Sequence, residues 1–398
     1  MIPYSRHKTN LTDAIKVGWQ VRFRTLTQGP EIEQFEADLA SYVGAKYAVA
    51  VNSATSGLHL AALALDLPRN STIATSPLSF VASANSILYS GHKPTFIDID
   101  ETTLNLDLRI LSDMLSSQSE IRAVIPVHFA GLPCSMSELR KLALTHEFFI
   151  IEDAAHALGA TYECGDKVGS CKYSDMTVLS FHPVKSITSG EGGAVTTNDE
   201  ALYRKLIRLR SHGITKMDDQ FTNNFLSQTS GETNPWYYEM ISLGFNYRMT
   251  ELQAVLGKSQ LRKLNKFIRI RQSLVENYDE AFMSNRIISP TQLGHRKLSA
   301  HHLYPIRINF SKLQISKKEF MLNLRKRGIG TQVHYCPIPC QPFYQQHGYQ
   351  IDTIPNALSY YHESLSIPLF PGLSERMQNK VISGIFREVE TNLNTIHH

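Results

Sequence analysis

The stretch FFIIEDAAHALGA, residues 148–160, decides the fold. It opens with four consecutive large apolar residues, and a run that is apolar at every position predicts a strand buried on both faces. The run ends in Glu152 and Asp153, and small residues then turn the chain toward His156. A buried strand whose end carries two carboxylates is typical of a parallel sheet with a ligand site at its carboxyl edge.

Similar short apolar runs lie on both sides of this strand. They are YAVAVNS (47–53), STIATSP (71–77), KPTFIDID (93–100), IRAVIPVHFAG (121–131), DMTVLSF (175–181) and GGAVTTND (192–199). Helical patterns such as SGLHLAALAL and SMSELRKLALTHE separate several of them. Buried strands that alternate with helices predict a mostly parallel sheet covered on both faces. The fold class is therefore α/β.

The pattern changes near residue 248, where RMTELQAVLGKSQLRKLNKFIRIRQSLVENYDEAFM predicts one long helix or two joined helices. We expect a large α/β domain over residues 1–255 and a small C-terminal α+β domain over 256–398. The polar segment 214–240 is too long for a tight connection, and such segments often form flaps or subunit contacts.

Composition excludes several classes of protein. The 398 residues are 42% apolar and 19% charged, which is typical of a globular chain, and the net charge of +4 is spread rather than clustered. Neither a nucleic-acid partner nor a membrane span of roughly 18 apolar residues is indicated. The five cysteines match no metal or redox spacing. We expect a cytoplasmic protein with reduced thiols and no metal site.

Polar residues at three strand ends suggest one site. AVNSATSGLHL places hydroxyls and Thr55 between a strand and a helix, which predicts either a phosphate cradle or ordinary helix capping. Asp153 either caps a turn or faces a cationic ligand, and His156 alone is more often a core histidine. Lys185, in SFHPVKSITSGEGGAV, is either a surface lysine or a desolvated amine that forms a Schiff base. In this stretch the glycines follow Lys185. A nucleotide-hydrolase phosphate loop needs its glycines before the lysine, so this motif is excluded.

Together these features match the three attachments of pyridoxal phosphate, and the sequence resembles a known family. SATSGLHLA, EDAAHALGA and SFHPVKSITSGEGGAVTTND resemble the signatures of the DegT/DnrJ/EryC-type sugar aminotransferases. The resemblance runs from PYSR near the start to GIGTQVHY and so covers nearly the whole chain. It implies a fold-type I, aspartate-aminotransferase-like enzyme. Relatives that dehydrate sugars carry histidine at the position of Lys185, so transamination is expected.

The resemblance also implies residue roles. Lys185 would bind the cofactor covalently and move protons, and Asp153 would pair with the pyridine nitrogen. The other cofactor contacts implied are Ala54, Thr55 and Ser180 at the phosphate, Phe80 stacked on the ring, and His156 at its oxygen side. The alternative for Phe80 is a core aromatic at a helix start. Asn246 is expected to reach the cofactor phosphate of a second subunit, which implies a homodimer with shared active sites.

The substrate implied is a UDP-linked keto-sugar, with L-glutamate as amino donor. Within the family, the sequence resembles the branch that aminates UDP-linked 4-keto-6-deoxy-N-acetyl-hexosamines in pseudaminic acid biosynthesis. Residues expected to contact this substrate are Tyr4, Arg24, Thr25, Leu26, Thr27, Ala54, Ser180, Asn246, His302, Leu303, Tyr304 and Pro305. Aminotransferases for a UDP-4-keto-pentose or for bacillosamine-type or perosamine-type sugars remain alternatives, because one methyl or acetamido group distinguishes these substrates only weakly. A cofactor-binding regulator is a further alternative.

Overall fold

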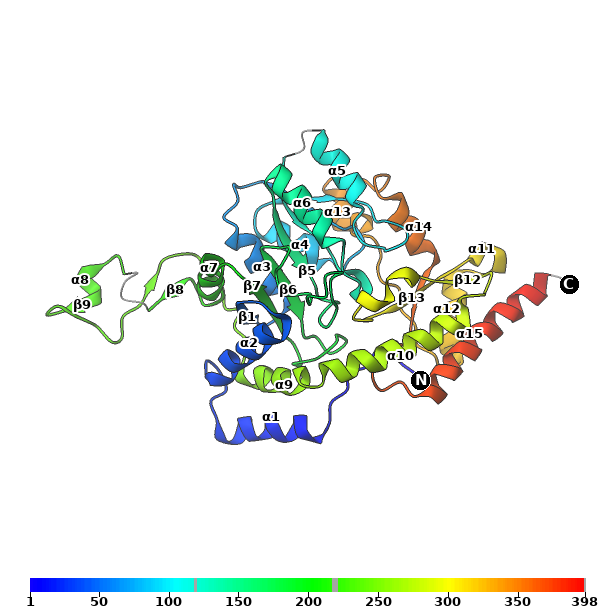
Figure 1. Cartoon of the computed structure of the whole chain (residues 1–398), viewed down its shortest axis with the longest axis horizontal. Helices are drawn as coiled ribbons and strands as arrows, with labels where there is room; N and C mark the ends of the chain where they lie inside the picture. The colour runs from blue at the N-terminus through cyan, green and yellow to red at the C-terminus, as the bar shows by residue number, and fades with distance from the viewer. Residues whose placement is uncertain (118–119, 217–220, 397–398) are drawn as a thin grey trace.

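The large part of the chain is built on one seven-stranded sheet (Figure 1). The computed structural model describes residues 1–117, 120–216 and 221–396. In spatial order the strands are β1 (Tyr47–Val51), β7 (Gly193–Thr197), β6 (Met176–Ser180), β5 (Phe149–Asp153), β4 (Ile121–Ile125), β2 (Thr72–Thr75) and β3 (Lys93–Phe96). Only β7 runs antiparallel to its two neighbours. The predicted α/β class with a mostly parallel sheet is confirmed, and each apolar run supplies one strand.

Helices cover both faces of this sheet, and successive side chains of a strand point alternately into the core on one face and the core on the other. The helices of this part are α1 (Leu11–Phe23), α2 (Pro30–Val43), α3 (Ala54–Ala64), α4 (Ala82–Tyr89), α5 (Leu108–Ser116), α6 (Met136–His146) and α7 (Glu200–Arg210), with a short 3-10 helix η1 (Phe129–Gly131). Val49 and Val51 join one core, with α3 and α4, whereas Ala48 and Ala50 join the other, with α2, α5 and α6.

Two consecutive helices, α9 (Glu251–Leu261) and α10 (Leu264–Phe282), carry the chain to a second core. That core surrounds an antiparallel sheet of β12 (Ile288–Pro290), β13 (Tyr304–Ile308) and β14 (Ser364–Ile367). The remaining helices are η3 (Leu293–Leu298), α11 (Phe310–Leu313), α12 (Lys317–Lys326), η4 (Ile338–Cys340), α13 (Pro342–Gln346), α14 (Pro355–Glu363) and α15 (Glu375–Ile396). Of these, η4, α13 and α14 pack against residues of the large part, in clusters with Ala84 and Phe129. The expected domain boundary at 255/256 falls inside α9 and stays a prediction.

The described residues of the segment 214–240, which are 214–216 and 221–240, project from the body as an arm (Figure 1). They form β8 (Ile214–Thr215), α8 (Asn224–Ser227), β9 (Gln228–Thr229), β10 (Glu232–Thr233) and β11 (Glu239–Met240). Phe225 is 90% exposed and Trp236 73% exposed on this arm. Across the described residues, none of the helices combines the length and apolarity that a membrane crossing requires.

Candidate active site

A cavity of about 660 Å³ lies where the carboxyl ends of β5 and β6 meet the start of α3 and two segments of the small domain. Ten of the residues expected from the sequence line it: Tyr4, Ala54, Thr55, Phe80, Asp153, His156, Ser180, Lys185, His302 and Leu303. They come from segments scattered over three hundred positions of the chain. The fold therefore gathers most of the expected cofactor residues in one place.

Asp153 ends β5 and is buried, at 5% exposure. One carboxylate oxygen accepts a hydrogen bond from Ser83 Oγ at 2.6 Å, and the other accepts one from the Ala155 amide at 3.1 Å. A carboxylate offers about four acceptor positions, so two donors leave capacity unused. Because Asp153 also lines the cavity, that capacity is available to a cationic group bound there.

The start of α3 forms another wall of the cavity. Ser53 is its N-cap, and its side chain accepts a hydrogen bond from the amide of Ser56. The preceding amides, of Ala54 and Thr55, belong to the first turn, where a helix supplies no internal acceptor. A Cβ at Gly193 would lie 2.6 Å from the Ala54 nitrogen, so glycine is required for β7 to pass this close. The arrangement offers amides and the positive helix end to an anion.

Lys185 follows β6 in the loop toward β7 and lines the same cavity. Burial removes water from the ammonium group and lowers the pKa of Lys185 to about 8, although the charge of Asp153 acts in the opposite direction. An amine with this pKa is substantially neutral near pH 8 and can attack a carbonyl carbon. The interpretation of Lys185 as an ordinary surface lysine is wrong.

An aromatic wall completes the cavity. Phe80 lines it with 57% of its surface exposed, so the alternative of a core aromatic is wrong. The Tyr335 hydroxyl lies 3.1 Å from His156 Nε2, and the His156 and His302 rings lie 4.4 Å apart. Burial, with the nearby Lys185 charge, holds the pKa of His156 well below its ordinary value. Its Nδ1 is buried without a hydrogen-bond partner among the described residues, which suits a polar ligand.

Seven expected residues lie outside this cavity. Tyr304 is fully buried in the small-domain core, where its hydroxyl bonds to Asp279 at 2.7 Å. The seven are Arg24, Thr25, Leu26, Thr27, Asn246, Tyr304 and Pro305. On β13, Tyr304 and Pro305 pair with β14, so we leave them out of the proposed site. The loop 24–27 and exposed Asn246 lie elsewhere on this chain.

Sequence reasoning missed Ser83, Tyr335 and His334. Ser83 lies three residues after Phe80, one helical turn on, and this spacing was a usable signal. Tyr335 and His334 lie in GIGTQVHY, which carries part of the family resemblance, but neither was predicted to contact a ligand. Their side chains line the cavity. Burial lowers the pKa of His334 to about 3, so its ring is neutral.

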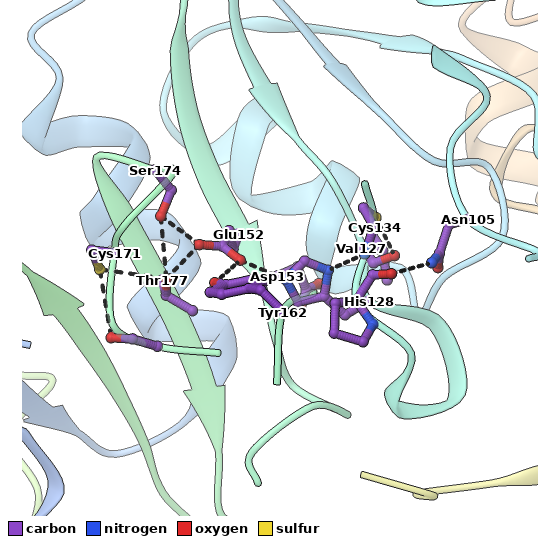
Figure 2. Close-up of polar contacts among 12 residues, drawn as sticks. Asn105, Val127, His128, Cys134, Glu152, Asp153, Tyr162, Cys171, Ser174 and Thr177 are labelled. Atoms are coloured by element: carbon purple, nitrogen blue, oxygen red, sulfur yellow. Dashed lines mark hydrogen bonds and ion pairs between the residues drawn. The ribbon is translucent and has the colours of Figure 1, made fainter. Parts of the chain in front are cut away.

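Behind the cavity, Glu152 lies in a closed polar network (Figure 2). Its carboxylate accepts hydrogen bonds from His128 Nε2 and Tyr162 Oη at 2.6 Å, Ser174 Oγ at 2.5 Å and Thr177 Oγ1 at 2.9 Å. The Cys134 amide donates to His128 Nδ1 at 3.2 Å, so the ring hydrogen of His128 is on Nε2. Burial opposes ionisation of Glu152, but these donors hold its pKa below the ordinary value.

Comparison with known proteins places this geometry in a family. The model of the DegT/DnrJ/EryC1/StrS aminotransferase family matches residues 8–386. The chain belongs to this family. The UDP-4-amino-4,6-dideoxy-N-acetyl-beta-L-altrosamine transaminase of Campylobacter jejuni is 38% identical over 369 residues, 92% of each protein. The spore coat polysaccharide biosynthesis protein SpsC of Bacillus subtilis is 37% identical over 377 residues, 94% of this chain and 92% of its own length.

Solved structures agree with the family assignment. Helicobacter pylori PseC, an aminotransferase involved in pseudaminic acid biosynthesis, superposes with a TM-score of 0.89 at 32% identity over 98% of this chain and 99% of its own. The putative sugar aminotransferase Spr1654 of Streptococcus pneumoniae, in a pyridoxamine phosphate form, gives 0.87 at 26% identity over 99% of this chain and 100% of its own. The chain is a pyridoxal-phosphate-dependent aminotransferase with the family fold. The predicted fold type, reaction class and cofactor are confirmed.

Pyridoxal phosphate fits the donor set of the cavity. An incompletely bonded Asp153 suits a pyridinium, the first turn of α3 suits a phosphate, and the lowered pKa of Lys185 suits imine chemistry. The exposed face of Phe80 provides an aromatic surface for a flat ring. The residues of this chain can thus hold each of the three parts of the cofactor.

Proposed function

We propose that this enzyme transfers the amino group of L-glutamate to the C4 ketone of a UDP-linked 4-keto-6-deoxy-N-acetyl-hexosamine. The products would be UDP-4-amino-4,6-dideoxy-N-acetyl-β-L-altrosamine, for pseudaminic acid biosynthesis, and 2-oxoglutarate. The observation that supports this reaction type is that Lys185, a desolvated amine, lines the same cavity as Asp153. The relatives named for this transamination support the sugar.

Each residue of the cavity has a separate role in the proposed reaction. When bound, pyridoxal phosphate supplies an electron sink that stabilises negative charge at a carbon next to nitrogen. Asp153 keeps the ring nitrogen protonated, and the α3 amides of Ala54 and Thr55, with Ser180, hold the phosphate. Lys185 Nζ accepts the proton from the α-carbon of L-glutamate and, in the second half of the cycle, returns a proton to C4 of the sugar. Neutral His156, held by Tyr335, borders the reacting groups without adding charge.

The decisive test substitutes the amine. We expect Lys185→Ala to lose the visible absorption band of the covalently bound cofactor and at least about 10³-fold of its turnover, because both covalent attachment and proton transfer are removed. Purified enzyme with L-glutamate is assayed by release of 2-oxoglutarate and by mass spectrometry of the sugar. A Lys185→Ala enzyme that still aminates the keto-sugar would overturn the assignment.

Other keto-sugars belong in the same assay, because SpsC, named for a different polysaccharide, is as similar to this chain as the altrosamine transaminases. A UDP-4-keto-pentose and the bacillosamine-type and perosamine-type ketones form the panel. Faster turnover of one of these would replace the proposed sugar but keep the reaction. Cofactor binding without release of 2-oxoglutarate from any donor and sugar would favour the regulator.

We also propose that the active sites are shared in a homodimer. Helix α1 buries its polar residues Asp13 and Gln20, yet exposes a stripe at four-residue spacing. The stripe is Leu11, Ile15, Trp19 and Phe23, each more than half exposed. An unpaired apolar face of this kind marks an association surface. The neighbouring loop 24–27, and exposed Asn246, would then serve the cavity of the second subunit.

The stripe gives a direct test of the dimer. We expect Trp19→Glu to convert a dimer into a monomer, because a charge on the apolar face would lose its water on association. Analytical ultracentrifugation measures the change, and activity should fall with dimerisation. The matched control is Lys16→Glu, on the same helix but not in the stripe. A wild-type chain that sediments as a monomer and is fully active would contradict the proposal.

A further inference from the structure

Two cysteines, Cys336 and Cys340, lie on the turn that directly follows Tyr335 of the cavity wall. Both thiols are free and partly exposed, so small oxidants in solution can reach them. The Pro337 carbonyl lies between them: Cys336 Sγ donates to it at 3.9 Å, and the Cys340 amide donates to it at 2.9 Å. The chain thus folds back and brings the second cysteine toward the first, although their spacing in the sequence matches no redox motif.

The surroundings of the two thiols give them different chemistry. Burial raises the pKa of the Cys340 thiol, and the charge of Cys336 and a hydrogen bond with its side chain raise that pKa further. Beside Cys336 lies the Lys317 ammonium, which bonds to the Tyr361 carbonyl and lies 4.3 Å from the centre of that ring. A cation near a sulfur favours the thiolate, which is the form that attacks an oxidant. Cys336 is therefore suited to attack first, and Cys340 to react second as a thiol.

The turn that carries the two cysteines connects the cavity wall to the large part of the chain. Directly before Cys336, the Tyr335 hydroxyl lies 3.1 Å from His156 Nε2. On the other side, the buried Ile338 donates its amide to the Pro77 carbonyl at 2.9 Å, in the loop after β2. A disulfide imposes its own geometry on the two residues that it joins. Because the Ile338 side of the turn is held, the resulting shift falls on Cys336 and on its neighbour Tyr335.

We propose that Cys336 and Cys340 form a reversible oxidation site, at which hydrogen peroxide converts the two thiols into one disulfide and slows the enzyme. The Cys336 thiolate attacks a peroxide oxygen, the O–O bond breaks, and hydroxide leaves as the sulfur becomes a sulfenic acid. The Cys340 sulfur then attacks the Cys336 sulfur, the S–O bond breaks, and water leaves as the disulfide forms. The two thiols lose two electrons and two protons, and the peroxide is reduced to two waters. Exchange with a thiol reductant restores both thiols.

The test treats the purified holoenzyme with hydrogen peroxide and then with a thiol reductant. Both cysteines lie on one tryptic peptide, 328–376, which should become lighter by two hydrogens on oxidation and recover its mass on reduction. This measurement does not depend on which donor or sugar the enzyme uses. We expect release of 2-oxoglutarate from L-glutamate to slow about fivefold in the oxidised enzyme and to recover with the reductant, because the hydrogen bond between Tyr335 and His156 is lost.

Serine variants identify the pair that responds. Cys336→Ser and Cys340→Ser should form no disulfide and keep most of their rate after peroxide treatment. The matched control is Cys164→Ser, which should respond like the wild type, since Cys164 is exposed and lines a different hollow. Tyr335→Phe should be slower than the wild type before oxidation and change little after it. Oxidation without the disulfide, a disulfide that leaves the wild-type rate unchanged, or an equal loss of rate in all three serine variants would overturn the proposal.

Discussion

Two consecutive carboxylates, Glu152 and Asp153, end the same buried strand but differ in their hydrogen bonding and in their access to the cavity (Figure 2). Glu152 has no exposed surface and accepts four hydrogen bonds from protein side chains. Asp153 points to the opposite face of the sheet, accepts two bonds and lines the cavity. The first carboxylate is satisfied by the fold, whereas the second is satisfied only when a ligand binds. Unused hydrogen-bonding capacity on a cavity therefore distinguishes a functional carboxylate from a structural one.

The largest expected effect is on catalysis at Asp153. We expect Asp153→Ala to lower kcat about 10³-fold, because removal of one partner of a buried charge pair costs about 3–5 kcal/mol. The free energy of unfolding of the apo-protein should fall by less than about 2 kcal/mol, since only the bonds to Ser83 and Ala155 are lost. Steady-state kinetics and urea unfolding measure the two quantities. An equal loss of activity in Glu152→Gln would remove the distinction between the two residues.

The next effect is on stability at Glu152. We expect Glu152→Ala to lower the free energy of unfolding by about 3–5 kcal/mol, because His128, Tyr162, Ser174 and Thr177 lose a shared acceptor. The kcat of the folded fraction should change only a few-fold. Urea unfolding with active-site titration separates stability from turnover.

A conservative change gives the control for this second effect. Glu152→Gln keeps one carbonyl acceptor for His128, and the hydroxyls of Ser174 and Thr177 can rotate to accept from the amide. It should therefore recover most of the stability lost in Glu152→Ala. Stability equal to the wild type in Glu152→Ala would show that the network contributes nothing to folding.

The contrast also explains how far the sequence could predict the site. Lys185, Asp153 and the α3 start were predicted because each follows a strand, and strand ends of a parallel sheet meet at one edge. The seven strands were predicted for the same local reason, since continuous apolar runs specify burial on both faces. These are properties of short segments, which a sequence displays directly.

Properties that depend on contacts between distant residues were harder to predict from the sequence. No feature of the local sequence distinguishes the roles of Glu152 and Asp153, because their hydrogen-bond donors come from residues 83 to 177. Tyr335 was not predicted at the site, because nothing in the sequence around it reveals that it meets His156, 179 residues away. Tyr304 was expected at the substrate, yet alternation along β13 turns its side chain into the small-domain core.

The smallest effect concerns the pH dependence of Lys185. An amine reacts when neutral, so with a pKa of about 8 its reactivity should rise about fivefold from pH 7 to pH 8 and level off above that. Rates of modification of the apo-protein by an amine-directed reagent, followed by mass spectrometry of the Lys185 peptide, give this profile. Because the charge of Asp153 raises the pKa of Lys185 against the effect of burial, Asp153→Asn should move the profile to lower pH. Glu152→Gln should leave the profile in place, because the Glu152 charge is directed to the opposite side of the sheet and is held by its own four donors. A shift of similar size in both variants would show that the two carboxylates act on the amine alike.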